Sequence, residues 1–224
     1  MVAAPQEATA ARPRPLLRGW LHLAAFAVVL VAGSLLILAG KTFGQRLCLT
    51  IYVASLALLF GVSAAFHRVQ WGPTGRRRMR RLDHSSIFIA IAGTYTAVAG
   101  LVLTGWTRNL VLIIVWGGAA IGIVIRQVWL DAPKWVVALP YVVVGWSALV
   151  VVPQLLHGLG VAGFLLLLAG GVAYTAGAIT YALKRPDPIP HVFGYHEVFH
   201  VCTVVGAALH FVVISAIALP AANR

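Results

Sequence analysis

The segment Trp20–Gly40, with the sequence WLHLAAFAVVLVAGSLLILAG, decides the class of fold because it contains no Asp, Glu, Lys or Arg. A helix needs about 20 predominantly apolar residues to cross the hydrocarbon core of a bilayer. The whole chain has the same character, since 61% of its 224 residues are hydrophobic and 10% are charged. A soluble domain has about 25% charged residues. The sequence therefore predicts an integral membrane protein.

Further apolar runs of similar length follow along the chain. They are Leu47–Phe66, Ser85–Trp106, Asn109–Ile125, Trp135–Val152, Leu159–Leu183 and Val198–Leu219. The fifth and sixth spans merge into one uncharged stretch, which we divide at Pro153–Gly158 because proline, glycine and polar residues there are typical of a turn. No run alternates between apolar and polar residues as the strands of a membrane barrel do. We predict an all-α polytopic membrane protein, a seven-transmembrane helix bundle over residues 19–224, after a disordered cytoplasmic tail over residues 1–18.

The 17 Lys and Arg residues are distributed unevenly between the two sides of the predicted bundle. If the N-terminus is cytoplasmic, all of them except Lys41, Arg46, Arg108 and Arg224 fall on the cytoplasmic side. Because basic residues concentrate in cytoplasmic loops, this bias predicts an N-in/C-out orientation. The same rule accounts for the net charge of +12. We therefore expect membrane lipids as partners and no nucleic acid, and the oligomeric state stays unknown.

The run His196-Glu197-Val198-Phe199-His200 is the strongest candidate for chemistry in the chain. Residues four apart share one face of a helix, so both imidazoles can reach one metal ion. In the predicted orientation, this pair lies near the cytoplasmic start of the seventh helix. His67 lies at the cytoplasmic end of the second helix, with Ser63 one turn deeper, and Asp83 begins the third helix. We therefore predict that three helices bring these side chains to one site.

The predicted metal ligands are the imidazoles of His67, His196 and His200. Three nitrogen ligands suit zinc and leave a fourth position for water, which is the arrangement of catalytic zinc sites. Zinc makes such a water a source of hydroxide near neutral pH. Asp83 would contact zinc through this water and shuttle its proton. Ser63 would orient a ligand or polarise a substrate carbonyl group.

The remaining histidines have simpler interpretations. A single histidine at a membrane interface usually contacts headgroups or a neighbouring helix, and we assign His22 and His191 to this role and His157 to the outer turn. His84 lies on a different face of its helix from Asp83, so we assign it to packing or hydrogen bonding. His210 shares a face with His200, but ten residues of helix separate the two by about 15 Å. His210 therefore cannot bind the same ion.

Two other motifs of the third span have structural interpretations. The basic run Arg76–Arg81 acts as a stop against translocation and draws anionic lipids to the nearby site. The run Gly93-Thr94-Tyr95-Thr96 lies in mid-span, where small residues let neighbouring helices approach closely.

Three of these motifs, in their order and spacing, resemble the hemolysin III family, the bacterial branch of the progestin and adiponectin receptor family. They are Ser63-x3-His67, the segment Asp83–Thr96 (DHSSIFIAIAGTYT) and His196–His200. The resemblance implies a seven-helix bundle, N-in and C-out, with zinc near the cytoplasmic face bound by the three histidines and, through water, by Asp83. The chain has Ala97 where proline is frequent in the family and Phe66 where tyrosine is common. Neither position is a ligand, so these departures bear on the shape of the cavity.

The family is related more distantly to alkaline ceramidases, which implies a zinc-dependent hydrolase of a lipid amide or ester. The open coordination position supports the same function. Two alternatives stay open. In the first, the protein is not an enzyme but a pore-forming hemolysin, a receptor or a protein of lipid homeostasis, and its zinc is structural. In the second, the protein is an intramembrane metalloprotease in which Glu197 is the general base. A composition rich in Ala, Val and Arg favours a bacterial plasma (inner) membrane.

Overall fold

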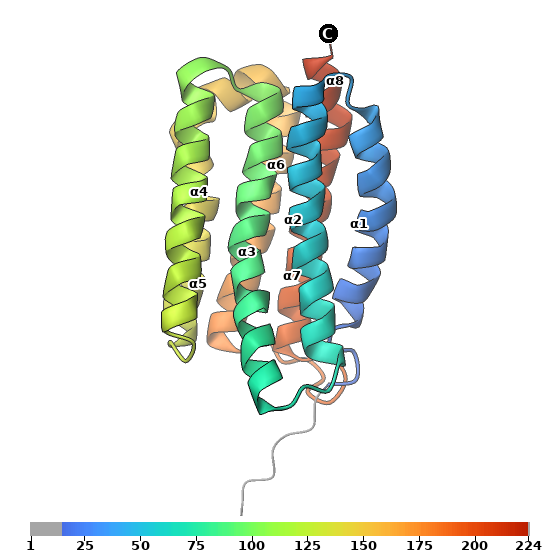
Figure 1. The fold of residues 1–224 in the computed structure, drawn as a ribbon, viewed down its shortest axis with the longest axis vertical. Coiled ribbons are helices and arrows are strands. Elements are labelled where there is room, and N and C mark those ends of the chain that lie inside the picture. Colours follow the sequence, from blue (N-terminus) through green and yellow to red (C-terminus); the bar gives the residue numbers. More distant parts are fainter. Residues whose placement is uncertain (1–14, 224) are drawn as a thin grey trace, which may run out of the picture.

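Helices account for nearly all of residues 15–223, which are the residues that the computed structural model describes. The long helices are α1 (Trp20–Ala39), α2 (Phe43–Arg68), α3 (Pro73–Val102), α4 (Gly105–Val128), α5 (Lys134–Gly145), α6 (Val152–Leu183) and α7 (Tyr195–Val212). A π-helical segment, η2 (Val213–Ala218), continues α7 into the short α8 (Leu219–Ala222). Over the described residues, the only β pairing is an isolated bridge between Ile189 and Phe193. The predicted all-α fold is confirmed, and Figure 1 shows the helices side by side in one bundle.

Six segments of the described chain are long and apolar enough to cross a membrane. Four of them are α1, α2, α3 and α4, and the others are the stretches Ala138–Leu183 and Tyr195–Ala222. The protein is therefore an integral membrane protein. The predicted fifth and sixth spans lie within the single stretch Ala138–Leu183, so the count of seven spans stays a prediction, as does the orientation.

The connection between α5 and α6 differs from the predicted turn at Pro153–Gly158. These residues are helical, because proline is well tolerated in the first turn of a helix and here starts α6 instead of ending a helix. The chain changes direction around them, at a 3₁₀ segment, η1 (Ser147–Val151), and at Gly160. Gly160 has a φ of 66° and a ψ of 174°, a conformation that is open to glycine and strained for other residues. Figure 1 shows this connection lying across the end of the bundle that carries the C-terminus.

Helix α3 begins three turns before Ser85, which is the first residue of the predicted third span. The predicted span excludes the residues before Ser85 because they are basic, but arginine is a good helix former and these residues are helical. Pro73 starts the helix in its first turn, where its missing N–H costs no hydrogen bond. The basic run is therefore part of α3, and Arg76, Arg80 and Asp83 recur at helical spacing along one element.

The predicted tail is described only in its last residues. Residues 1–14 lie outside the described part of the chain. Residues 16–19 form a turn before α1. The backbone N–H groups of Leu16 and Leu17 donate hydrogen bonds to the carbonyl oxygens of His191 and Val192. The start of the described chain is thereby attached to the connection between α6 and α7.

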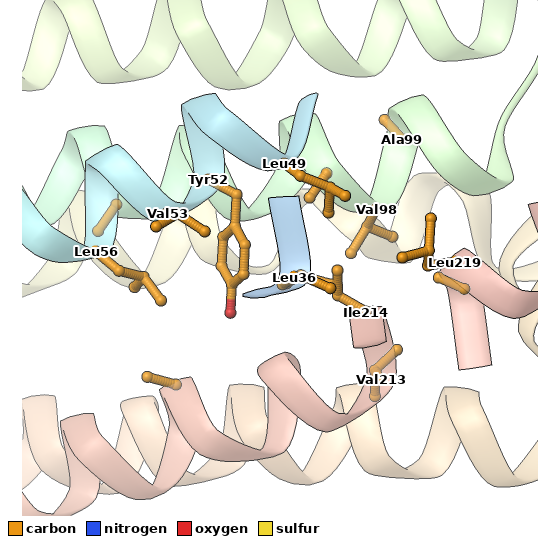
Figure 2. Packing of buried hydrophobic residues seen from close by; sticks show 14 of the residues in the cluster. Leu36, Leu49, Tyr52, Val53, Leu56, Val98, Ala99, Val213, Ile214 and Leu219 are labelled. Carbon is orange, nitrogen blue, oxygen red and sulfur yellow. The ribbon is translucent and has the colours of Figure 1, made fainter. Parts of the chain in front are cut away.

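The core of the bundle is densest where α2 and α3 pack together. Figure 2 shows a buried cluster formed by Leu49, Tyr52, Val53 and Leu56 of α2 with Leu36, Val98, Ala99, Val213, Ile214 and Leu219. Gly93 of α3 faces α2 so closely that a Cβ atom at this position would lie 2.6 Å from the Cβ of Ser55. The prediction that small residues around Gly93 allow close helix contact is confirmed.

We expect Gly93→Val to destabilise the bundle by about 1–3 kcal/mol, because the added side chain overpacks the contact with Ser55. The matched control is Gly117→Val on α4. Gly117 is exposed, and a Cβ atom there meets no atom within 4 Å. Thermal unfolding in detergent measures both. Equal melting temperatures for the two variants would contradict the close packing of α2 on α3.

Candidate metal centre

Three histidines meet where the end of α2 approaches the start of α7. One ring nitrogen from each of His67, His196 and His200 belongs to a group whose members all lie within 4.8 Å of one another. The closest pair is the Nε2 atom of His67 and the Nε2 atom of His196, which are 3.1 Å apart. The ring centroids of His196 and His200 are 4.6 Å apart. The predicted convergence of these side chains is therefore present in the structure.

Local structure explains how the three rings come together. His67 lies in the last turn of α2, directly before the helix ends at Arg68. His196 and His200 lie in the first turns of α7, and their spacing of four places both rings on one face. His200 is almost completely buried, whereas His67 and His196 are partly exposed.

The donor set fits a zinc ion. Two nitrogens bound tetrahedrally to zinc at 2.0–2.1 Å lie about 3.3 Å from each other, and the observed Nε2–Nε2 distance of 3.1 Å is close to this value. The ring nitrogen of His200 lies within 4.8 Å of the other two nitrogens, so a small side-chain movement would bring it to the same spacing. Among the described residues, the three histidines alone form this group. Asp83 is not a member of this group, and its contact with the ion through water stays a prediction.

Asp83 and Ser63 lie beside the histidines in one cavity. Ser63 is buried and lies one turn before His67 on α2, and Asp83 lies on α3. Both residues line a cavity of about 460 Å³ that is also lined by His67, His196 and His200. Away from this end, aliphatic residues of several helices contribute to the wall, among them Leu59, Ile87, Ala90, Ile91, Ala138 and Val142. Threonine and tyrosine side chains and His210 are interspersed among them, whereas the charged residues of the wall, Arg18, Arg76, Arg80 and Asp83, lie at the end with the three histidines.

His22 was wrongly assigned to the membrane interface. Its side chain is 2% exposed, and its ring stacks on His200 with centroids 3.7 Å apart and planes 11° apart. Neither ring nitrogen has a hydrogen-bond partner among the described residues. His22 lies on the face of α1 that packs into the bundle, because the buried residues Val29, Gly33 and Leu36 follow it at helical spacing. One signal in the sequence pointed to this role, since His22 is the only ionisable residue of the segment Trp20–Gly40.

Arg18 is not among the predicted site residues, and Glu197 has a predicted role only in the metalloprotease alternative. The carboxylate of Glu197 is fully buried and accepts a hydrogen bond of 2.9 Å from the backbone N–H of Gly194, which caps the start of α7. Its other oxygen pairs with Nε of Arg18, and Arg18 also lines the cavity. This ion pair connects the turn before α1 to the helix that carries His196 and His200. Sequence spacing gave no sign of it, because the partners are 179 residues apart.

The hydrogen bonding predicted for His84 is confirmed, whereas His157 is part of α6 and not of the predicted turn. Nδ1 of His84 is 2.7 Å from the carbonyl oxygen of Arg80, one turn earlier on α3. Nε2 of His210 is 3.0 Å from the carbonyl oxygen of Leu167 on α6, so His210 joins two helices away from the metal centre. His191 and His157 are exposed.

We expect Glu197→Ala to lower the free energy of unfolding by about 3–5 kcal/mol, because it leaves the Arg18 guanidinium without its buried partner. The matched control is Asp131→Ala, which removes an ion pair with Arg80 at 2.9 Å in which the Asp131 side chain is 76% exposed. Such a pair is worth about 0–1 kcal/mol. Denaturant titration in detergent compares the two variants. A loss of similar size in both would mean that the Arg18–Glu197 pair does not hold α7 in place.

Comparisons with known proteins identify the family of this chain. A model of the family described as "Haemolysin-III related" matches residues 10–211. The chain is similar to "Hemolysin-3" of Bacillus cereus, with 32% identity over 174 residues that cover 78% of this chain and 76% of the relative. It is also similar to "Hemolysin-3 homolog" of Bacillus subtilis (strain 168), with 33% identity over 162 residues that cover 72% of this chain and 73% of that one. The chain belongs to the haemolysin-III-related family.

Proposed function

We propose that the protein is a zinc-dependent hydrolase that cleaves an amide or ester bond of a membrane lipid. One observation carries the proposal, namely that three convergent imidazoles, a carboxylate and a hydroxyl line the polar end of one largely apolar cavity. Polar groups within a membrane protein are costly unless they are paired or functional. A structural metal site would not require the cavity, and a lipid-binding cavity would not require the histidines.

His67, His196 and His200 would hold the ion. When bound, zinc supplies a Lewis acid that polarises a carbonyl group and makes water more acidic. Because the protein provides three nitrogen ligands, coordination positions remain for exchangeable molecules, as in catalytic zinc sites. His22 would hold the His200 ring in place from its buried side by stacking against it.

Asp83 would act as the general base and then as the general acid. Its carboxylate accepts a proton from water as the oxygen of that water forms a bond to the carbonyl carbon of the substrate. The bond from this carbon to the leaving nitrogen or oxygen then breaks, and Asp83 returns the proton to the leaving atom. Ser63, which lines the same cavity, would donate a hydrogen bond from its hydroxyl to the carboxylate of Asp83 and so position it. The products are a carboxylic acid and an amine or alcohol.

The shape of the cavity favours a lipid as the substrate. The scissile bond would lie near the histidines, and the acyl chain would extend between aliphatic side chains such as Leu59 and Ile91. Each methylene group removed from water contributes about 0.8 kcal/mol, so the chain would supply much of the binding energy. In the predicted orientation the reaction takes place near the cytoplasmic face, in the bacterial plasma membrane.

Lysis of membranes is a second candidate function, favoured by the name "Hemolysin-3" of the two relatives. In this case a zinc ion would connect α2 and α7 as a structural element. A pore needs a continuous polar surface along several helices, whereas the charged residues of this cavity lie at one end and an adjoining small cavity is lined mainly by apolar side chains. The geometry therefore favours the hydrolase over the pore.

The arrangement around Glu197 argues against an intramembrane metalloprotease. A general base must reach the water that it deprotonates. Both oxygens of Glu197 are engaged, one by the backbone N–H of Gly194 and the other by Arg18. The residue is fully buried and does not line the cavity. Asp83 is better placed for this role.

We expect the purified protein to contain one zinc ion per chain. His67→Ala and His196→Ala should each weaken zinc binding by more than about 100-fold, because loss of a supporting residue outside the ligand set already costs 10–100-fold. The control is His157→Ala, which removes an exposed histidine far from the centre along the chain. Elemental analysis after dialysis measures the zinc content. Full zinc occupancy in both ligand variants would exclude the three-histidine site.

We expect Asp83→Asn to keep its zinc and to lower the rate of lipid hydrolysis by about 10²–10⁴-fold, because the amide cannot accept the proton. Asp131→Asn, which alters an exposed acid, should retain the wild-type rate. Release of fatty acid from N-acyl and O-acyl lipids in detergent micelles measures the reaction. Wild-type turnover in Asp83→Asn would remove Asp83 from the mechanism, and no turnover of either lipid class by the wild type would favour the non-enzymatic function.

A further inference from the structure

A second, smaller cavity adjoins the one that contains the candidate metal centre. Its volume is about 70 Å³, and a cavity of about 10–15 Å³ already admits a water molecule. The two cavities share the residues Thr94, Tyr95, Gly145, Trp146, Gly171 and His210. We refer to these six residues as the junction. The small cavity therefore lies directly beside the large one, and the junction lies between them.

The small cavity lies far from the histidines along the helices. On α7, His210 follows His200 by ten residues, which is about 15 Å of helix. On α3, Tyr95 follows Asp83 by twelve residues, or about 18 Å. Beyond the junction the wall consists of apolar residues such as Val98, Leu103, Val111, Leu155 and Phe164. The charged residues thus lie at one end of the two cavities, and a pocket with a mainly apolar wall lies at the other.

The junction is held in a fixed shape by its own hydrogen bonds. The hydroxyl of Tyr95 donates to the carbonyl oxygen of Gly145 at 2.7 Å and accepts from the backbone N–H of Ala148 at 2.7 Å. The indole Nε1 of Trp146 donates to the hydroxyl of Thr175 at 2.9 Å. Because these polar atoms have partners in the protein, the two aromatic rings can present apolar surface to a ligand.

We propose that the small cavity binds the methyl end of the acyl chain and that the junction sets the length of chain that the protein accepts. This inference rests on the proposed function, because it assumes that the polar end of the lipid lies at the metal centre. An acyl chain that is too short to pass the junction leaves the small cavity empty, so it gains no binding energy from burial of methylene groups there. A chain too long for the pocket cannot be fully accommodated without overpacking.

Two glycines of the junction leave room for a substitution. A Cβ atom at Gly145 meets no atom within 4 Å, and one at Gly171 would lie 3.9 Å from the nearest atom of Trp146. At neither position does a neighbouring atom lie close enough to clash with an added Cβ atom. Since each glycine lines both cavities, Gly145→Val and Gly171→Ala should narrow the passage while the bundle keeps its fold.

The test measures the binding of straight-chain saturated fatty acids of increasing length to the purified full chain by native mass spectrometry. For the wild type, affinity should rise about fourfold per added methylene and then level off once the pocket is full. In Gly145→Val and Gly171→Ala the rise should stop at a shorter chain. Gly117→Val on α4, which makes the same change away from both cavities, should match the wild type.

Two results would overturn the inference. One is an unchanged length profile in both junction variants, each with the wild-type melting temperature. The other is an affinity in the wild type that does not depend on chain length. Because fatty-acid binding is measured without turnover, the experiment tests the role of the junction independently of the proposed hydrolase activity. A shifted profile without hydrolysis would contradict the hydrolase alone, whereas hydrolysis with unshifted profiles would contradict the junction alone.

Discussion

The need to satisfy three imidazoles inside a membrane protein governs the rest of this structure. A polar side chain within the bilayer requires a partner or a function, and His67, His196 and His200 face one another. One cation would satisfy all three rings at once. Their convergence requires the end of α2 and the start of α7 to lie at the same depth. The bundle meets this condition through the close packing of α2 on α3 and of α1 on both α2 and α7.

The start of the described chain takes part in fixing that geometry. Leu16 and Leu17 bind the connection between α6 and α7 through backbone hydrogen bonds. Arg18 then neutralises Glu197, whose carboxylate caps α7, and one turn later His22 stacks on His200. A buried ion pair is weak evidence for stability by itself, since desolvation offsets much of the attraction. The role of the Arg18–Glu197 pair is to hold α7 in place, because α7 carries two of the three predicted ligands.

The sequence predicted the helical class and the members of the candidate site, because both depend on local patterns. Long uncharged runs identify apolar helices, and a spacing of four identifies two rings on one helix face. The rest depends on tertiary contacts that spacing does not encode. The inward orientation of His22, the Arg18–Glu197 pair and the cavity are examples. The turn at Pro153–Gly158 was misplaced because proline can start a helix as well as end one, and the roles of Asp83, Ser63 and zinc stay predictions.

The most direct test of the account is X-ray absorption at the zinc edge on the purified protein. The account predicts a first shell that contains three imidazole nitrogens at about 2.0–2.1 Å and one further light atom. It also predicts that His200→Ala removes one imidazole from this shell or removes the metal altogether. A spectrum dominated by sulfur ligands, or a shell that is unchanged in His200→Ala, would show that α2 and α7 do not form the metal centre.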